Sequence, residues 1–251
     1  MRDHGTFRYV FGVLIRSRLT GLLIGTGAAL ILGSCILTYL TPGTERRTFF
    51  DAAYLGLELL AILGPLLGSM FLQALEFEQR TIWLVLVRPP TRPAYTRGRW
   101  AGLTGASGIA IAACGALLGV MMLAIRAFPE PWFMPVVVAA LLESALLAAM
   151  ACAVASITTT SLTAILVDFG IVVLGYLSAI LPALALKTPM ASLKLLLWGT
   201  YWLLPHLSLF AVRELADAPE SWYLAWLGGY SILYSAAALT LAAWLLHRRE
   251  V

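Results

Sequence analysis

The sequence predicts an all-α membrane protein with six transmembrane helices, and three observations lead to this fold class: composition, long apolar segments and the placement of basic residues. Hydrophobic residues make up 61% of the 251 residues and charged residues 12%, whereas a soluble domain carries about 45–50% and about 25%. A soluble fold of this length could not bury so much apolar surface, but lipid would solvate it. We therefore treat residues 1–251 as a single transmembrane domain.

Six segments are long and apolar enough to cross a bilayer, which requires about 20 mostly apolar residues per helix. These segments are 19–40, 52–73, 101–125, 134–157, 162–186 and 222–246. Pro65 and Pro182 are expected to kink the second and fifth of them. The three cysteines lie inside apolar runs without the spacing of metal ligands, which argues against a disulfide framework or a zinc site.

The basic residues predict the orientation of the helices. With six spans both termini lie on one side, and that side receives eleven of the 17 Lys and Arg residues, in segments 1–18, 74–100 and 247–251. Because Lys and Arg concentrate in cytoplasmic loops, we expect both termini in the cytoplasm and the chain in a bacterial-type inner membrane. The positive net charge thus reflects orientation and does not indicate a nucleic-acid partner.

Residues 1–18 form a distinct N-terminal segment. Phe7, Val10, Phe11 and Leu14 follow the spacing of one helical stripe, and arginines flank them. This pattern predicts an amphipathic helix on the cytoplasmic membrane surface, in contact with membrane lipids. The alternative is a simple extension of the first span.

The stretch 187–221 is apolar but interrupted by Pro189, Pro205 and Pro219. A seventh span here would move the C-terminus outside and remove the charge asymmetry. We therefore predict a re-entrant segment made of short helices that dip into the outer leaflet. Such irregular backbone is tolerated only where protein or water covers it.

The loop 74–100 has the features of a docking element. It begins with acids, continues as an amphipathic run and stops at Pro89-Pro90, after which arginines lead back into the membrane. This order predicts a short interfacial helix that could bind a cytoplasmic partner. A plain interfacial loop without a partner is the alternative.

The same loop resembles that of the permease subunits of type-2 ABC exporters, whose pattern is E-x-E-x-G-T, a hydrophobic run, then P-[I/L]-[S/T]-R-x-x-Y-x-x-G-[K/R]-x-x-G. The residues in register are Glu76, Glu78, Thr81, Pro89, Thr91, Arg92, Tyr95, Gly98, Arg99 and Gly102. Arg80 stands where the family has glycine. Residues 203–210, LLPHLSLF, resemble the family's broken segment before the last span, so the resemblance extends over nearly the whole chain.

The resemblance implies that the loop is a coupling helix seated in a groove of a separate ATPase. Thr81 and Ile82 would form the seat, Glu76, Glu78 and Arg80 would pair with charges at its rim, and Arg92 completes the predicted coupling residues. Two permeases, either two copies or one copy and a related chain, would assemble with two ATPase subunits.

The resemblance also implies which chemistry this chain leaves to its partner. ATP and Mg would be bound by the ATPase, and this chain would be a transport subunit with no catalytic, cofactor-binding or metal-binding residues. In agreement, the sequence contains no G-x-x-x-x-G-K-[ST] phosphate loop. The transported substrate would be a lipid, a lipid-linked glycan or an amphipathic small molecule.

Three acids, Glu58, Glu143 and Asp168, lie within predicted spans. An ionised acid at mid-bilayer costs about 2.5–3.5 kcal/mol on insertion scales, so such residues face the bundle interior or a wet cavity and often mark a pathway. They are our candidates for a translocation path, and a purely structural role is the alternative. A channel or proton-coupled carrier that uses Glu143 is the rival function, and a non-transporting scaffold is a third.

Overall fold

The computed structural model covers residues 1–251 and describes all of them except 1–2, 41–44, 79–91, 125–129, 216–218 and 249–251. All regular structure in the described part is helical. The α-helices are α1 (Asp3–Arg16), α2 (Arg18–Leu40), α3 (Glu45–Glu78), α5 (Arg92–Ala124), α6 (Phe133–Ile157), α7 (Ser161–Leu177), α8 (Leu181–Lys187), α9 (Ala191–Leu203) and α10 (Ser221–Arg248). Two 3-10 turns, η1 (Leu207–Phe210) and η2 (Val212–Glu214), precede α10.

Within the described residues, five helices are long and apolar enough to cross a membrane, and a sixth span results if α7 and α8 are taken together. The chain is therefore an all-α protein with the helices of a multi-pass membrane protein. The sequence placed α2, α6 and α10 within one or two residues of their observed limits. It made α3 and α5 too short, because both helices continue into polar sequence at their ends.

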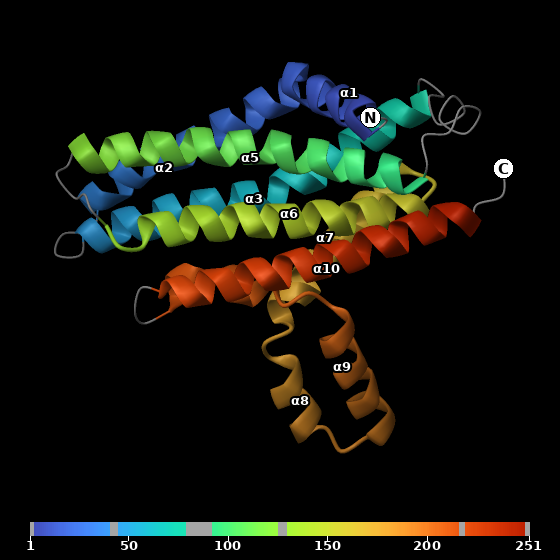
Figure 1. The fold of residues 1–251 in the computed structure, drawn as a ribbon. Coiled ribbons are helices and arrows are strands. Elements are labelled where there is room, and N and C mark those ends of the chain that lie inside the picture. Colours follow the sequence, from blue (N-terminus) through green and yellow to red (C-terminus); the bar gives the residue numbers. More distant parts are fainter. Residues whose placement is uncertain (1–2, 41–44, 79–91, 125–129, 216–218, 249–251) are drawn as a thin grey trace.

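The fifth predicted span, 162–186, was expected to be kinked at Pro182, and the structure divides it into two helices. Helix α7 ends at Leu177, and α8 starts at Leu181 after a bend of 70°. Pro182 lies in the first turn of α8, where the missing N–H of proline costs nothing. The expected kink at this proline is therefore a helix break, and α8 pairs with α9 to form a hairpin (Figure 1).

Helix α1 is separate from α2, which rules out the simple extension of the first span. The two helices meet at Ser17, whose hydroxyl donates to the Leu14 carbonyl over 2.6 Å. The predicted apolar stripe exists, but Val10 and Leu14 are buried against protein. Helix α1 lies along α5 (Figure 1), so part of the stripe that we assigned to the membrane packs on α5.

The long helices run side by side, and the α8–α9 hairpin projects away from them (Figure 1). The start of α1, the end of α3, the start of α5 and the end of α10 lie toward one end of the bundle. We call this the loop end, because it receives both limits of the segment 79–91. The opposite end receives the end of α2 and the start of α3.

Helices α3 and α6 form the centre of the bundle. More than half of each span is buried inside the protein, whereas α2 and α10 are mostly exposed. Small residues allow close packing at the centre: a Cβ on Gly64 of α3 would approach the Ser107 side chain of α5 to 2.7 Å. Ser107 in turn forms a 2.7 Å hydrogen bond with Ser144 of α6. The polar residues described below as candidates for a functional site lie on or beside α3 and α6.

Candidate functional site

At the loop end, Glu76 and Arg99 form a buried ion pair between α3 and α5. The Arg99 Nη1 donates to Glu76 Oε2 over 2.7 Å, and both side chains are largely shielded from solvent. The Tyr95 hydroxyl donates to the other carboxylate oxygen, Oε1, also over 2.7 Å. Both oxygens of Glu76 therefore have partners inside the chain, a geometry that the expected pairing with the rim of an ATPase did not include.

Two further residues of the motif, Gly98 and Gly102, form the seat of α1 on α5. A Cβ on Gly98 would approach the Cβ of Thr6 to 2.7 Å, and one on Gly102 would approach Val10 Cγ1 to 2.5 Å. Any larger residue would thus push α1 away from α5. On α5, Tyr95 and Arg99 thus face α3, whereas Gly98 and Gly102 face α1.

The other predicted coupling residues are not placed by the structure. Arg80, Thr81 and Ile82 lie outside the described residues, as does the expected helix between Glu78 and Arg92. Glu78 is the last residue of α3 and Arg92 the first of α5, and only their backbone positions are described. The structure therefore brings Glu76 to Tyr95 and Arg99, which the sequence did not predict.

Deeper in the bundle, Glu58 of α3 pairs with Arg213 of η2. The Arg213 Nε lies 3.0 Å from Glu58 Oε2 without the alignment of a hydrogen bond, so charge attraction holds the pair. Arg213 also donates to the Asp51 carbonyl over 3.2 Å. Arg213 comes from the broken segment 155 residues further along the chain, so the apolar runs by themselves did not indicate this pair.

Glu143 lies at the centre of α6 and is 1% exposed. Its Oε1 accepts a 2.6 Å hydrogen bond from the Tyr176 hydroxyl of α7. Its Oε2 is buried and has no hydrogen-bond partner among the described residues. Glu58 lies within electrostatic range, so two carboxyl groups share this part of the core.

The third candidate, Asp168 of α7, lies near the loop end and is 4% exposed. Arg99 is the cation that acts on it electrostatically, and the buried thiol of Cys152 on α6 is close to both. The structure thus separates the three predicted pathway acids into two groups. Glu58 and Glu143 belong to the middle of the bundle, and Asp168 belongs to the region of Glu76 and Arg99.

The broken segment between α9 and α10 packs against the bundle, and its predicted re-entrant position in the outer leaflet stays a prediction. Leu204 has the extended backbone expected before a proline, and Leu207, Phe210 and Val212 are buried. The segment approaches α7 at Gly175, where a Cβ would lie 2.9 Å from the Pro205 carbonyl oxygen. It therefore packs against α7 close to the end of that helix.

A row of tyrosines on α10 satisfies the backbone of this segment. The Tyr223 hydroxyl donates to the Leu209 carbonyl over 2.9 Å, and the Tyr230 hydroxyl accepts from the His206 N–H over 2.9 Å. The Tyr234 hydroxyl donates to the Leu203 carbonyl. This structural role of the tyrosines was not predicted, although their helical spacing after a proline-broken stretch could have suggested it.

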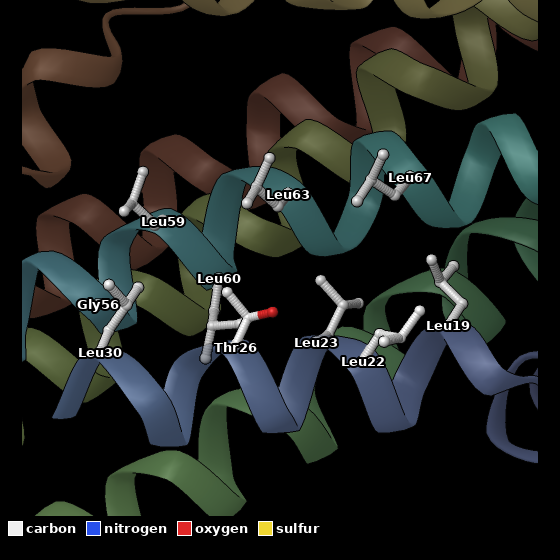
Figure 2. A pocket seen from close by; sticks show the side chains of 10 residues that line it. All are labelled: Leu19, Leu22, Leu23, Thr26, Leu30, Gly56, Leu59, Leu60, Leu63 and Leu67. Atoms are coloured by element: carbon white, nitrogen blue, oxygen red, sulfur yellow. The ribbon is translucent and has the colours of Figure 1, made fainter. Parts of the chain in front are cut away.

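An apolar groove lies between α2 and α3 and has a volume of about 170 Å³ (Figure 2). Leu22, Leu23 and Leu30 line it from α2, and Leu59 and Leu63 line it from α3, with Thr26 as the one polar side chain (Figure 2). None of the candidate acids contributes to it. The groove can accommodate hydrocarbon but offers nothing to a charged solute.

Two observations limit the functions and families that can be assigned to the chain. Among the described residues there is no group of three or more His, Cys, Asp or Glu side chains that could hold a metal ion. No protein-family model matches the chain, and a search of curated proteins finds no match. Functional assignment therefore depends on the residues and on their geometry.

The Glu58–Arg213 pair generates a stability prediction. The variant Arg213→Gln leaves a mostly buried carboxylate without its counter-ion, and we expect a loss of about 2 kcal/mol or more, which lowers the melting temperature by several degrees. Thermal unfolding of the detergent-solubilised chain measures it. Arg47→Gln is the matched control, because the Arg47–Asp51 pair is exposed and is worth under about 1 kcal/mol. Equal shifts for the two variants would show that the Glu58–Arg213 pair contributes no more than a surface contact.

Proposed function

We propose that the chain is the transmembrane subunit of an ATP-driven exporter of the type-2 ABC class. The observation that carries the proposal is the loop end itself. Five residues of the family-like motif form one unit that joins α3, α5 and α1. They are Glu76, Tyr95, Gly98, Arg99 and Gly102. A unit that fixes both limits of a cytoplasmic loop and the N-terminal helix is what a docking element for an ATPase requires.

In this proposal ATP is bound and hydrolysed by a separate chain. The ATPase would seat the segment 79–91 in a groove, with Thr81, Ile82 and the neighbouring apolar residues as the seat and Arg80 at the rim. A short helix in a groove is held by a few apolar anchors, and charges at its edge fix the register. Glu76 takes a different role from the one first expected, since its carboxylate supports the loop from inside the bundle.

The proposed assembly contains two permeases and two ATPase subunits in a bacterial-type inner membrane, with both termini cytoplasmic. The positions of the helix ends support this orientation. The start of α1 and the end of α10 lie at the loop end (Figure 1), which carries the basic residues, so an even number of crossings is required. This in turn requires that α7 and α8 together complete one crossing or that the re-entrant segment takes its place.

The substrate class that fits is apolar or amphipathic. Exposed apolar surface extends over α2, α7 and α10, and the groove between α2 and α3 is lined by leucines. In the core, Glu58 pairs with Arg213, and Glu143 accepts a hydrogen bond from Tyr176. A lipid, a lipid-linked glycan or an amphipathic small molecule would move along or between such helices with less desolvation than a compact ion.

The anchor residue of the loop provides the test. In the complex purified with its ATPase, Ile82→Asp should abolish co-purification or lower ATP hydrolysis several-fold, because a carboxylate buried in an apolar groove costs several kcal/mol. Ile82→Leu, which keeps the apolar contact, is the control and should behave like the wild type. A complex that keeps full yield and full hydrolysis with Ile82→Asp would show that this loop does not couple the two chains.

A second candidate function, a proton-coupled carrier, is favoured by one specific observation. Glu143 is fully buried, and one of its carboxylate oxygens has no partner among the described residues. A carboxyl group in this position could take up and release a proton during transport. This function would need no ATPase.

The variant Glu143→Gln separates the two candidates. It removes the titratable group while keeping an oxygen that can accept from Tyr176, so expression and thermal stability should not fall. ATP-driven export should continue in this variant, measured as transport in vesicles loaded with ATP. A proton-driven carrier would instead lose uptake driven by an imposed pH gradient, and that result would favour the second candidate.

A further inference from the structure

The apolar groove between α2 and α3 is open along its length. Its lining residue Leu22 is 67% exposed and Leu30 is 38% exposed, so no other part of the described chain covers it. Leu30 and Gly56 line one end, and Leu19 and Leu67 line the other (Figure 2). The second end lies nearer the loop end of the bundle, because α3 continues from Leu67 toward Glu78. The groove is thus an unfilled apolar surface with a defined direction.

Two arginines stand at the end of the groove that Leu19 lines. Arg18 is the first residue of α2, and Arg16 is the last residue of α1. Both are exposed, and neither forms an ion pair with another described residue. Arg18 precedes Leu22 by four residues, so it lies on the same face of α2, one turn closer to the start of the helix. Helical side chains lean toward the N-terminus, so Arg18 extends beyond the groove at this end.

The occupant that fits this surface is apolar along its length and anionic at one end. From Leu19 to Leu30 the groove follows α2 for about 16 Å, at about 1.5 Å per residue. This length is about half of the ~30 Å hydrocarbon core of a bilayer, which is the depth of one leaflet. An apolar helix of a protein partner would fill the groove but would leave both arginines without an anion. A phospholipid brings the hydrocarbon and the anion together.

We propose that the groove binds one acyl chain of an anionic glycerophospholipid, whose phosphate is held by Arg16 and Arg18. A guanidinium binds phosphate through paired N–H donors, and the leucines offer van der Waals contact to the hydrocarbon chain. Because α2 is mostly exposed, the lipid would add contacts to a helix that has few. This inference goes beyond the proposed function, since the lipid is a bound component of the fold and not the transported substrate.

Native mass spectrometry of the delipidated full-length chain in detergent measures this binding. The chain is titrated with phosphatidylglycerol and with phosphatidylcholine that carries the same acyl chains. We expect the first phosphatidylglycerol to bind at least about tenfold more tightly, because each arginine near an anionic lipid contributes about fivefold. The double variant Arg16→Gln/Arg18→Gln should bind the two lipids equally. Equal affinity of the wild type for both lipids, or an unchanged preference in this variant, overturns the proposal.

A second double variant, Arg8→Gln/Arg47→Gln, controls for net charge. It removes two exposed charges from other parts of the chain and should keep the preference for phosphatidylglycerol. If both double variants lose the preference equally, the lipid responds to total charge and the proposed headgroup site is wrong.

The acyl-chain part of the site is tested independently at Thr26, an exposed residue midway along the groove (Figure 2). Thr26→Trp fills the groove and should weaken binding of the first phosphatidylglycerol about tenfold, whereas Thr26→Val has a similar shape and should bind like the wild type. Unchanged lipid binding by Thr26→Trp overturns the proposal. If this variant also changes the oligomeric state, a second copy of the chain occupies the groove instead. Every measurement uses the chain without an ATPase, so the result does not depend on the proposed function.

Discussion

The ion pair between Glu76 and Arg99 is the contact on which the loop end of the bundle depends. A guanidinium and a carboxylate that are both shielded from water must stay together, because separating them would leave two uncompensated charges. Since Glu76 lies in the last turn of α3 and Arg99 in the first turns of α5, their 2.7 Å contact fixes how far apart the two helices stand. The same stretch of α5 carries the glycines that seat α1. One short segment of sequence therefore sets the relative positions of three helices.

A second constraint operates where the chain is irregular. Inside a bilayer, backbone N–H and C=O groups must find partners within the protein, yet Pro205 interrupts the helical pattern between α9 and α10. Tyr223, Tyr230 and Tyr234 meet this requirement by hydrogen-bonding to backbone groups of the broken segment. Arg213 belongs to the same segment and pairs with the buried Glu58. The broken segment is thus held by polar contacts with α3 and α10.

The sequence predicted the long helices well, because hydropathy over about 20 residues is a strong signal. Helices α2, α6 and α10 consist almost entirely of such apolar sequence. The stripe at Val10 and Leu14 and the prolines also indicated a helix before α2 and breaks before α10. The membrane-surface and re-entrant positions predicted for these two segments stay predictions. The sequence predicted only a kink at Pro182 in the fifth span and not the 70° break between α7 and α8, since hydropathy continues unchanged through that break. It also could not supply the partners of Glu58 and Glu76. Those contacts join residues far apart in sequence, and only the packing of α3 against α5 and η2 brings them together.

In the proposed function, force is applied to the bundle at the loop end. The central claim is that the force comes from a separate ATP-hydrolysing chain. Native mass spectrometry of the complex purified in mild detergent tests this most directly. We predict a species containing two copies of this 27.1 kDa chain, or one copy and a related permease, together with two copies of a chain that binds ATP. Detection of the 27.1 kDa chain only by itself or in homo-oligomers, with bound lipids alone, would contradict the account.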